Sequence, residues 1–202
     1  MVRVAVLVSG GGTNLQALLD AGAAGRLPDA ALALVVSSRP DAGALRRAQI
    51  AGVKTAVVCR REYESGAAFD AALLALLREN DIGLVVLAGF LSILGPAVIA
   101  AYPRRILNVH PSLIPSFCGA GFYGLRVHEA ALARGVKVTG ATVHYVNEIP
   151  DGGEILLQKA VAVEPGDTPQ TLQRRVMEQA EWQLLPQAVA LVTARLTNEK
   201  QA

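Results

Sequence analysis

The sequence predicts an α/β fold in a single domain over residues 1–202: a Rossmann-like, mostly parallel twisted sheet flanked by helices, with an antiparallel C-terminal extension. A chain of 202 residues fits the roughly 250 that one hydrophobic core serves. Hydrophobic residues make up 52% of the chain but aromatic residues only 4%. This composition suits strands that helices bury on both faces. Short apolar runs also alternate with helical patterns, as in βαβ units.

The elements follow from these patterns in order. Residues 2–8 form a β-branched strand, three glycines follow, and Thr13 begins a helix with leucines at helical spacing. We expect further strands over 32–38, 55–59, 84–88 and 105–110, with helices over 42–51, 67–79 and 96–101. Ligands of open parallel sheets bind at the carboxyl ends of the strands, so the chemistry is expected there.

The pattern changes after residue 110. Residues 111–124 hold two prolines, three glycines and no regular period, and a loop of this length is usually functional. A helix over 127–134 follows, then an antiparallel pair of strands over 139–146 and 155–163. Thr168 is a good N-cap before Pro169 at N1, and it opens one long final helix.

Charge and cysteine content narrow the class of protein. The net charge is +2 and no run of Lys or Arg exceeds two, which argues against a nucleic-acid partner. Cys59 and Cys118 are isolated, with no spacing typical of a metal site. The apolar runs fall short of the ~20 residues that cross a bilayer, and no leader precedes the first strand. We therefore expect a cytoplasmic protein without a membrane role. A homodimer is one of the states that the sequence allows.

The glycine turn suggests an anion site. Gly12, Thr13 and Asn14 lie where backbone amides meet a helix N-terminus, which favours a phosphate group. The turn lacks the Lys of a P-loop, and Leu15 stands where a dinucleotide fingerprint has its last glycine. The alternative is a turn that only connects strand and helix.

Two strand-end residues could act on one substrate atom. Asn108 and His110 are two residues apart, so they point to the same side of the strand and could bind an oxyanion. The alternative for His110 is a hydrogen bond to the backbone. Asp151 lies in a Pro-Asp-Gly-Gly turn, where Asp is also good turn chemistry. A carboxylate is needed, however, to move the proton of an attacking amine.

Other polar residues are weaker candidates. Glu178 and Glu181 are three residues apart on the final helix and could hold sugar hydroxyls, although a solvated helix face is the alternative. We expect His144 in the core or beside the catalytic groups, and His128 on a helix surface.

Taken together, the motifs resemble the phosphoribosylglycinamide formyltransferases, folate-dependent enzymes of purine synthesis, over nearly the whole chain. The segments that carry the resemblance are VLVSGGGTNLQALLDA, VVLAGFLSILGP, LNVHPSLIPSFCGAGFYGLRVHEAAL and GATVHYVNEIPDGG. The resemblance implies the formyltransferase fold and transfer of a formyl group from 10-formyltetrahydrofolate to the amine of glycinamide ribonucleotide. It implies small-molecule partners and no metal.

The resemblance also assigns roles to residues. Asn108, His110 and Asp151 match the catalytic triad; Gly12, Thr13 and Asn14 match the phosphate turn; and Glu181 matches the ribose site, to which the spacing adds Glu178. The folate-binding residues implied are Phe90, Leu91, Ser92, Ile93, Leu94, Leu107, Val109, Asn147, Glu148 and Ile149.

Two departures concern the folate tail, because some members carry Arg at the positions of Ser92 and Gly66. In addition, Trp182 stands where members often have His, and residues 116–124 are of a longer loop type. The alternatives are a 10-formyltetrahydrofolate hydrolase, a methionyl-tRNA formyltransferase, and a folate- or nucleotide-binding module without turnover.

Overall fold

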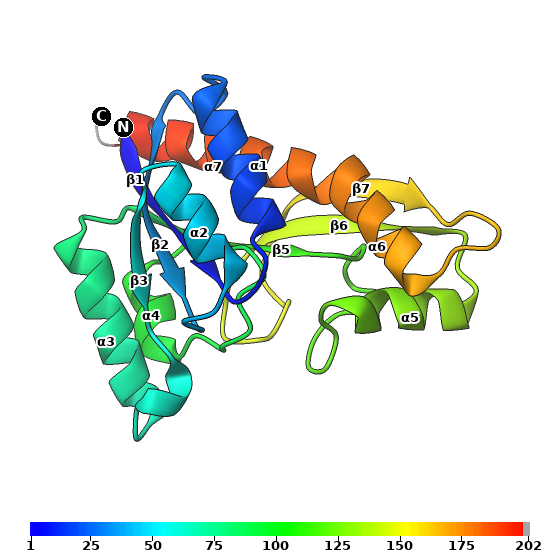
Figure 1. The fold of residues 1–202 in the computed structure, drawn as a ribbon, viewed down its shortest axis with the longest axis horizontal. Coiled ribbons are helices and arrows are strands. Elements are labelled where there is room, and N and C mark those ends of the chain that lie inside the picture. The colour runs from blue at the N-terminus through cyan, green and yellow to red at the C-terminus, as the bar shows by residue number, and fades with distance from the viewer. Residues whose placement is uncertain (200–202) are drawn as a thin grey trace.

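The computed structural model describes residues 1–199, in which seven strands form one sheet (Figure 1). The strands are β1 (Val2–Val8), β2 (Ala30–Ser37), β3 (Lys54–Val57), β4 (Leu84–Leu87), β5 (Ile106–His110), β6 (Val138–Tyr145) and β7 (Ile155–Ala162). Their order is β3-β2-β1-β4-β5-β6-β7. The first five are parallel, and β6 and β7 run antiparallel to their neighbours. The predicted fold class is confirmed, with strand ends that differ from the expected ones by up to two residues.

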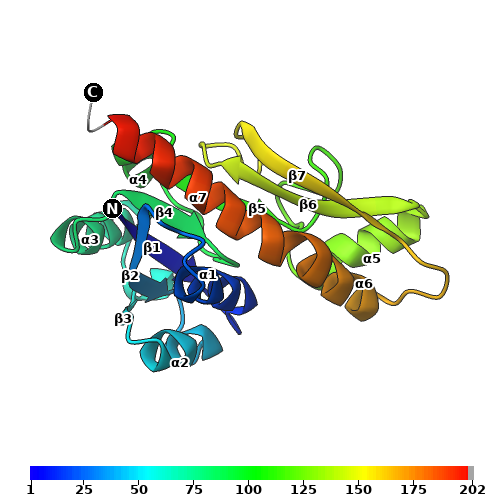
Figure 2. The ribbon, with the colours of Figure 1, turned by 90° about the horizontal axis from the view of Figure 1, so that it is seen from above.

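Helices cover both faces of the parallel part (Figure 2). The helices are α1 (Thr13–Ala23), α2 (Gly43–Ile50), α3 (Gly66–Glu79), α4 (Pro96–Ala101), α5 (Leu125–Arg134), α6 (Pro169–Val176) and α7 (Trp182–Glu199), and Arg60–Glu62 form a 3₁₀ turn, η1. One face packs against α1, α2 and α7, and the other against α3 and α4. Alternate residues of β1 divide between the two cores, with Val4 and Val6 on one side and Ala5 and Leu7 on the other. None of the helices in residues 1–199 is long and apolar enough to cross a membrane.

The final helix differs from the prediction. Thr168 caps α6 as expected, accepting a hydrogen bond from the amide of Thr171, and Pro169 occupies the first turn. The predicted single helix is wrong, however, because Met177–Glu181 form a π-helical turn between α6 and α7. A π turn adds one residue to the helical period and is common at functional sites. A 3.6-residue pattern cannot reveal it.

His128 is a second correction. We predicted it on a helix surface, but its side chain is fully buried, and neither ring nitrogen has a hydrogen-bond partner. The reason is that α5 packs against α6 and turns the face with Val127, His128 and Ala131 inward. Burial, and then the nearby His110, lower the pKa of His128 to about 4, so this imidazole is neutral at pH 7.

Candidate active site

The glycine turn after β1 is held by the next helix of the same face, α2. The amide of Ala44 donates to the Gly10 carbonyl at 3.1 Å, and Arg47 Nε donates to the Gly11 carbonyl at 2.8 Å. Gly12 has φ +75°, and a Cβ there would lie 2.6 Å from the Ala44 methyl group. These contacts fix two carbonyls of the turn, and the N-terminus of α1 begins at Thr13. No sequence pattern predicts this role of Arg47, because its partner is a backbone carbonyl 36 residues away.

Asn14 and Glu181 meet at the edge of this turn. Asn14 Nδ2 donates to Glu181 Oε2 at 2.6 Å, and both side chains are buried. Burial raises the pKa of Glu181 to about 7, against the opposing effect of the Asn14 hydrogen bond. The buried Asn14 Oδ1 has no partner. An unpaired acceptor in a cleft is a place for a ligand donor.

Glu178 does not join Glu181. The π turn makes the Glu178 and Glu181 side chains point in different directions. Glu178 forms an ion pair with Arg174 at 2.7 Å, and its side chain is 44% exposed. Of the predicted pair, the structure brings only Glu181 to the cleft. Glu178 follows the alternative, a solvated helix face.

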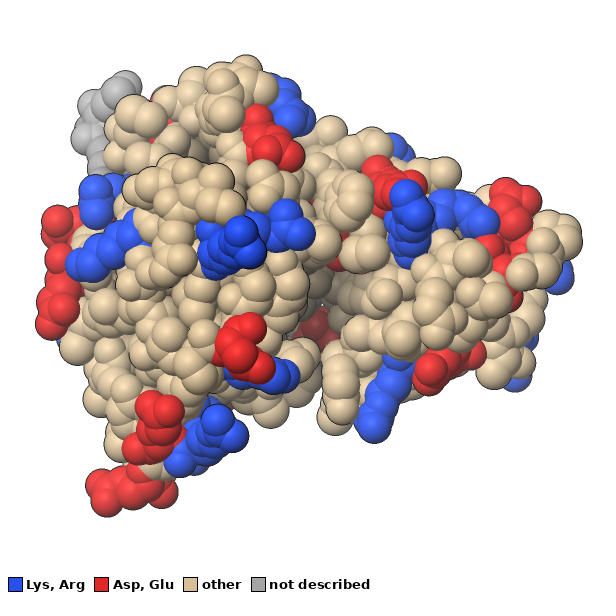
Figure 3. Space-filling view, viewed as in Figure 1, with Lys and Arg blue, Asp and Glu red and all other residues tan. Residues whose placement is uncertain are grey.

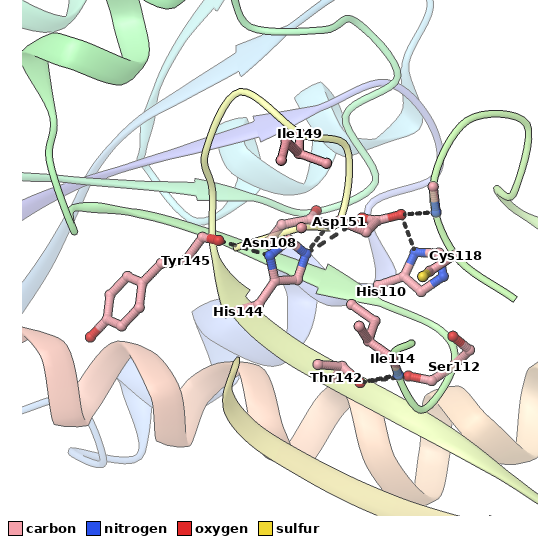
Figure 4. A network of polar contacts seen from close by, with 12 residues as sticks. Asn108, His110, Ser112, Ile114, Cys118, Thr142, His144, Tyr145, Ile149 and Asp151 are labelled. Atoms are coloured by element: carbon pink, nitrogen blue, oxygen red, sulfur yellow. Dashed lines mark hydrogen bonds and ion pairs between the residues drawn. The ribbon is translucent and has the colours of Figure 1, made fainter. Parts of the chain in front are cut away.

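The polar group at the end of β5 comes from three elements (Figure 4). Asn108 and His110 lie on β5, His144 faces them from β6, and Asp151 comes from the turn before β7 with φ +55°. His110 Nδ1 lies 3.4 Å from Asp151 Oδ2, and His144 Nε2 lies 3.4 Å from Asp151 Oδ1. Asn108 Nδ2 contacts His144 Nε2 at 3.1 Å and donates to Asp151 Oδ1 at 3.3 Å. Asn108, His110 and Asp151, predicted from two separate motifs, therefore converge.

His144 fixes the orientation of this group. Its Nδ1 donates to the Tyr145 carbonyl at 2.8 Å, and its Nε2 contacts both the Asn108 amide at 3.1 Å and Asp151 Oδ1 at 3.4 Å. The ring is buried. His144 thus lies in the core and beside the catalytic candidates, which is where the sequence suggested it would be.

The long loop over residues 111–124 closes onto the same group. His110 Nε2 donates to the Phe117 carbonyl at 2.9 Å, and the amide of Gly119 donates to Asp151 Oδ2 at 2.8 Å. Phe117 has φ +50°, a left-handed conformation that is uncommon outside glycine. The loop therefore occupies positions that a substrate oxygen could take.

The protonation of His110 and Asp151 follows from their surroundings. Burial lowers the pKa of His110, and the Asp151 charge and the Phe117 carbonyl oppose that effect only in part. Burial alone would raise the pKa of Asp151, but hydrogen bonding from His144, the charge on His110 and the Gly119 amide together lower it. Asp151 is therefore ionised at neutral pH. Both ring nitrogens of His110 face acceptors. Negative charge that develops nearby therefore stabilises the protonated form of the ring.

Two cavities meet at this group. One, of about 240 Å³, reaches from Asn14 and Glu181 to Asn108, His110 and Asp151. The other, of about 370 Å³, extends from Asn108 and Asp151 along an apolar wall. Figure 3 shows the cleft between the two parts of the molecule, with acidic atoms at its floor. The six residues that line both cavities are Phe90, Leu91, Asn108, Phe122, Tyr123 and Asp151.

The second cavity contains most of the predicted folate-binding residues. Its lining includes Phe90, Leu91, Ser92, Ile93 and Leu94 on one side and Asn147, Glu148 and Ile149 on the other. Four of the ten large apolar side chains exposed in the described chain lie here: Leu91, Ile93, Tyr123 and Ile149. Such a gathering marks a binding surface.

The two β5 residues predicted as folate contacts divide. Val109 lines the first cavity although it is largely buried, but Leu107 is fully buried and lines neither cavity. The Leu107 side chain points to the opposite face of β5 from Asn108 and packs in the core that includes α7. Within residues 1–199 there is also no group of three or more His, Cys, Asp or Glu side chains that could hold a metal ion.

The fold and the site define a formyl transferase. Residues 2–189 match the family described as "Formyl transferase". The phosphoribosylglycinamide formyltransferase of Haemophilus influenzae is 38% identical over 96% of this chain and 88% of that relative. A solved glycinamide ribonucleotide transformylase 1 from Symbiobacterium toebii has a TM-score of 0.90 at 44% identity, covering 96% of this chain and 88% of that one. The chain therefore belongs to the phosphoribosylglycinamide formyltransferases.

Longer relatives contain a similar segment. The trifunctional purine biosynthetic protein adenosine-3 of Gallus gallus is 44% identical over 195 residues, which cover 96% of this chain. The match covers only 18% of that relative. The chain thus spans about a fifth of the length of these trifunctional proteins.

Proposed function

We propose that this chain transfers the formyl group of 10-formyltetrahydrofolate to the amine of glycinamide ribonucleotide in purine synthesis. The observation that carries the proposal is that two cavities of different chemistry meet at Asn108 and Asp151. A reaction between two bound molecules needs such a junction, because holding both reactants together removes much of the entropic cost of their encounter.

The first cavity suits the ribonucleotide. Its phosphate group would lie at the glycine turn, where the N-terminus of α1 favours an anion. The ribose hydroxyls would donate to Glu181 and to the unpaired Asn14 Oδ1. The amine would then point toward Asn108 and His110, which line the far end of the same cavity.

The second cavity suits the folate. Its apolar side chains would pack on the pterin ring, and polar backbone and side-chain groups of residues 147–151 would face the ring edge. Leu91 is 61% exposed and Ile93 is 80% exposed in the structure. Burying these side chains under a ring would contribute favourable free energy at about 25 cal/mol per Å².

In the proposed reaction the neutral amine attacks the formyl carbon and creates an oxyanion. The oxyanion accepts a hydrogen bond from His110 Nε2 in place of the Phe117 carbonyl. It also accepts one from the Asn108 amide, in place of the 3.3 Å hydrogen bond to Asp151. Asp151 accepts the proton that the amine loses, directly or through water. The same proton then passes from Asp151, directly or through water, to N10 of the folate as the bond between N10 and the formyl carbon breaks.

The test is a spectroscopic assay with 10-formyltetrahydrofolate, with and without glycinamide ribonucleotide. Formation of formylated ribonucleotide that depends on the amine supports the proposal. Release of formate without the ribonucleotide would instead indicate a hydrolase, and binding without turnover would indicate a binding module. The cytoplasmic location and the homodimer stay predictions.

A further inference from the structure

A further hollow lies on the outer side of α1, beside the glycine turn. Helix α1 runs between α2 and the start of α7 (Figure 2). The hollow measures about 310 Å³, and none of its lining residues lines the first or the second cavity. Its only residue in the proposed phosphate turn is Thr13. The lining residues that matter below are Thr13, Gln16, Asp20, Arg26, Arg47 and Trp182.

Two cations of this hollow have no acidic partner. Arg47 donates to the Gly11 carbonyl at 2.8 Å and to Gln16 Oε1 at 3.0 Å, which are both neutral acceptors. Within the part of the chain that the structure describes, no carboxylate lies within ion-pair distance of Arg26 or Arg47. Asp20, the one acidic residue of the lining, accepts a hydrogen bond from Gln16 at 2.8 Å instead. The hollow therefore has a net positive charge, and its guanidinium groups suit a phosphate.

The aromatic part of the lining is Trp182, the only tryptophan of the chain. Its indole Nε1 is buried and has no hydrogen-bond partner among residues 1–199. A buried donor without a partner beside a hollow is a place for a ligand acceptor. The faces of indole rings also stack well on the planar bases of nucleotides. The hollow thus combines groups for a phosphate with a group for a base.

We propose that this hollow is a second ligand site, which binds a nucleoside monophosphate and thereby weakens the binding of the ribonucleotide in the first cavity. The phosphate group pairs with Arg26 and Arg47, and the base stacks on Trp182. Asp20 accepts a hydrogen bond from a hydroxyl or amino group of the ligand, because its carboxylate has further acceptor positions.

Arg47 connects the two sites. It holds the turn at which the ribonucleotide phosphate is proposed to bind, and Thr13 of that turn also lines the hollow. Two phosphate groups beside one turn repel each other and share the field of one guanidinium group. Each ligand therefore lowers the affinity for the other, and by the same factor. This coupling rests on the proposed function, whereas binding in the hollow does not.

The fluorescence of Trp182 measures binding to the full chain directly. AMP, adenosine and inorganic phosphate are titrated with glycinamide ribonucleotide at saturation, so that the first cavity is filled. AMP should quench the fluorescence and bind about 10-fold or more tightly than adenosine or phosphate, because its base and its phosphate both make contacts. Inorganic phosphate that binds as tightly as AMP would overturn the assignment of a nucleotide.

Two variants separate the contacts. Arg26→Ala should weaken AMP binding about 10-fold, since it removes a charged hydrogen-bond donor. Arg134→Ala, at another exposed arginine on α5, is the control and should bind AMP as the parent does. Calorimetry replaces fluorescence for Trp182→Phe, which should bind AMP more weakly and inorganic phosphate unchanged. Equal AMP affinity in the parent and Arg26→Ala would overturn the site.

The coupling is measured as the KM of the ribonucleotide at increasing AMP. This KM should rise about 2- to 5-fold at unchanged kcat and then level off, because both ligands can be bound together. In Arg26→Ala the rise should need about 10-fold more AMP, while kcat and KM without AMP stay those of the parent. A KM that rises without limit, and equally in both chains, would mean that AMP competes in the first cavity and would overturn the proposal.

Failure of the proposed function gives a different result. If the chain does not formylate the ribonucleotide, that function is wrong, and calorimetry with AMP alone still tests the hollow. An AMP affinity that falls in both Arg26→Ala and Trp182→Phe supports the site. Absence of AMP binding, or the same affinity in the parent and both variants, contradicts it.

Discussion

The carboxyl ends of β1 and β5 lie two strands apart in one sheet, yet they build their sites in opposite ways. At the end of β1 the groups proposed to bind the phosphate are backbone amides, and α2 holds the turn through hydrogen bonds from Ala44 and Arg47 to its carbonyls. At the end of β5 the groups are side chains, and β6 and the loops hold them through His144, Phe117 and Gly119. The difference teaches that one end depends on backbone conformation and packing, and the other on the identity of a few side chains. Substitutions should therefore affect binding at β1 and chemistry at β5.

The largest effect should come from Asp151→Asn. The variant keeps the shape of the side chain but cannot accept the proton of the amine, so kcat should fall by about 10²-fold or more, with little change in the KM of the ribonucleotide. Steady-state kinetics would measure both constants. Asp81→Asn, an equally conservative change at an exposed position after α3, is the control. Near-full turnover in Asp151→Asn would remove the carboxylate from the mechanism.

Gly12→Ala should mainly damage the β1 end. A methyl group would lie within 3 Å of Ala44, and φ +75° strains any residue with a side chain. Strain and overpacking together should lower the free energy of unfolding by about 3 kcal/mol and raise the KM of the ribonucleotide. Chemical denaturation would measure the first quantity. Gly22→Ala in α1 has no neighbour within 4 Å and ordinary φ, so it should stabilise the chain slightly. If Gly12→Ala and Gly22→Ala had the same free energy of unfolding, the turn would not be packed against α2 as described.

The protonation of Glu181, which contacts Asn14 beside the end of β1, should make the stability of the chain depend on pH. Its folded pKa of about 7 lies above its ordinary 4.5, so between these values the folded chain holds a proton that the unfolded chain lacks. Stability should therefore fall as pH rises through this window, by about 2 kcal/mol from pH 5 to pH 7. Denaturation of the parent and Glu181→Gln across this range would isolate the contribution. Glu178→Gln, at an exposed ion pair, should follow the parent curve. If the free energy of unfolding of Glu181→Gln changed with pH as that of the parent does, the raised pKa of Glu181 would be contradicted.

Arg47→Ala should have the smallest effect of the four. It removes the hydrogen bond to the Gly11 carbonyl, which contributes about 1 kcal/mol, so the KM of the ribonucleotide should rise about fivefold at unchanged kcat. Initial-rate kinetics would test this against Arg46→Ala, an exposed neighbour on α2. A fall in kcat without a change in KM would mean that the β1 end takes part in chemistry, and the contrast between the two strand ends would be lost.

Much of the fold could be predicted because its signals are local. The β-branched run over 2–8, the cap at Thr168 and the alternation of strands and helices each depend on neighbouring residues. The convergence of Asn108 and His110 also follows from one strand. What could not be predicted depends on packing between distant segments: the burial of His128 under α6 and the hydrogen bond from Arg47 to the glycine turn.

The pair Glu178 and Glu181 illustrates the limit most clearly. Their spacing predicted a shared face of an α-helix, and the inserted π turn separated them. No residue type in Met177–Glu181 announces a π turn, because it forms where tertiary contacts on both sides require different helical phases. Asp151 is a similar case in that its turn chemistry was evident, but its contact with Gly119 of a loop 32 residues earlier was not.

The π turn also makes the length of the last helical segment a functional quantity. A deletion of one residue within 177–181 would let α6 and α7 join as a regular helix. The apolar residues of α7, such as Leu185 and Val189, would then rotate by about 100° relative to α6, unless α6 rotated instead. Either Leu172 and Val176 or the α7 face would leave the core, and Glu181 would leave Asn14. The chain therefore cannot be shortened here without moving apolar residues out of the core and Glu181 away from Asn14.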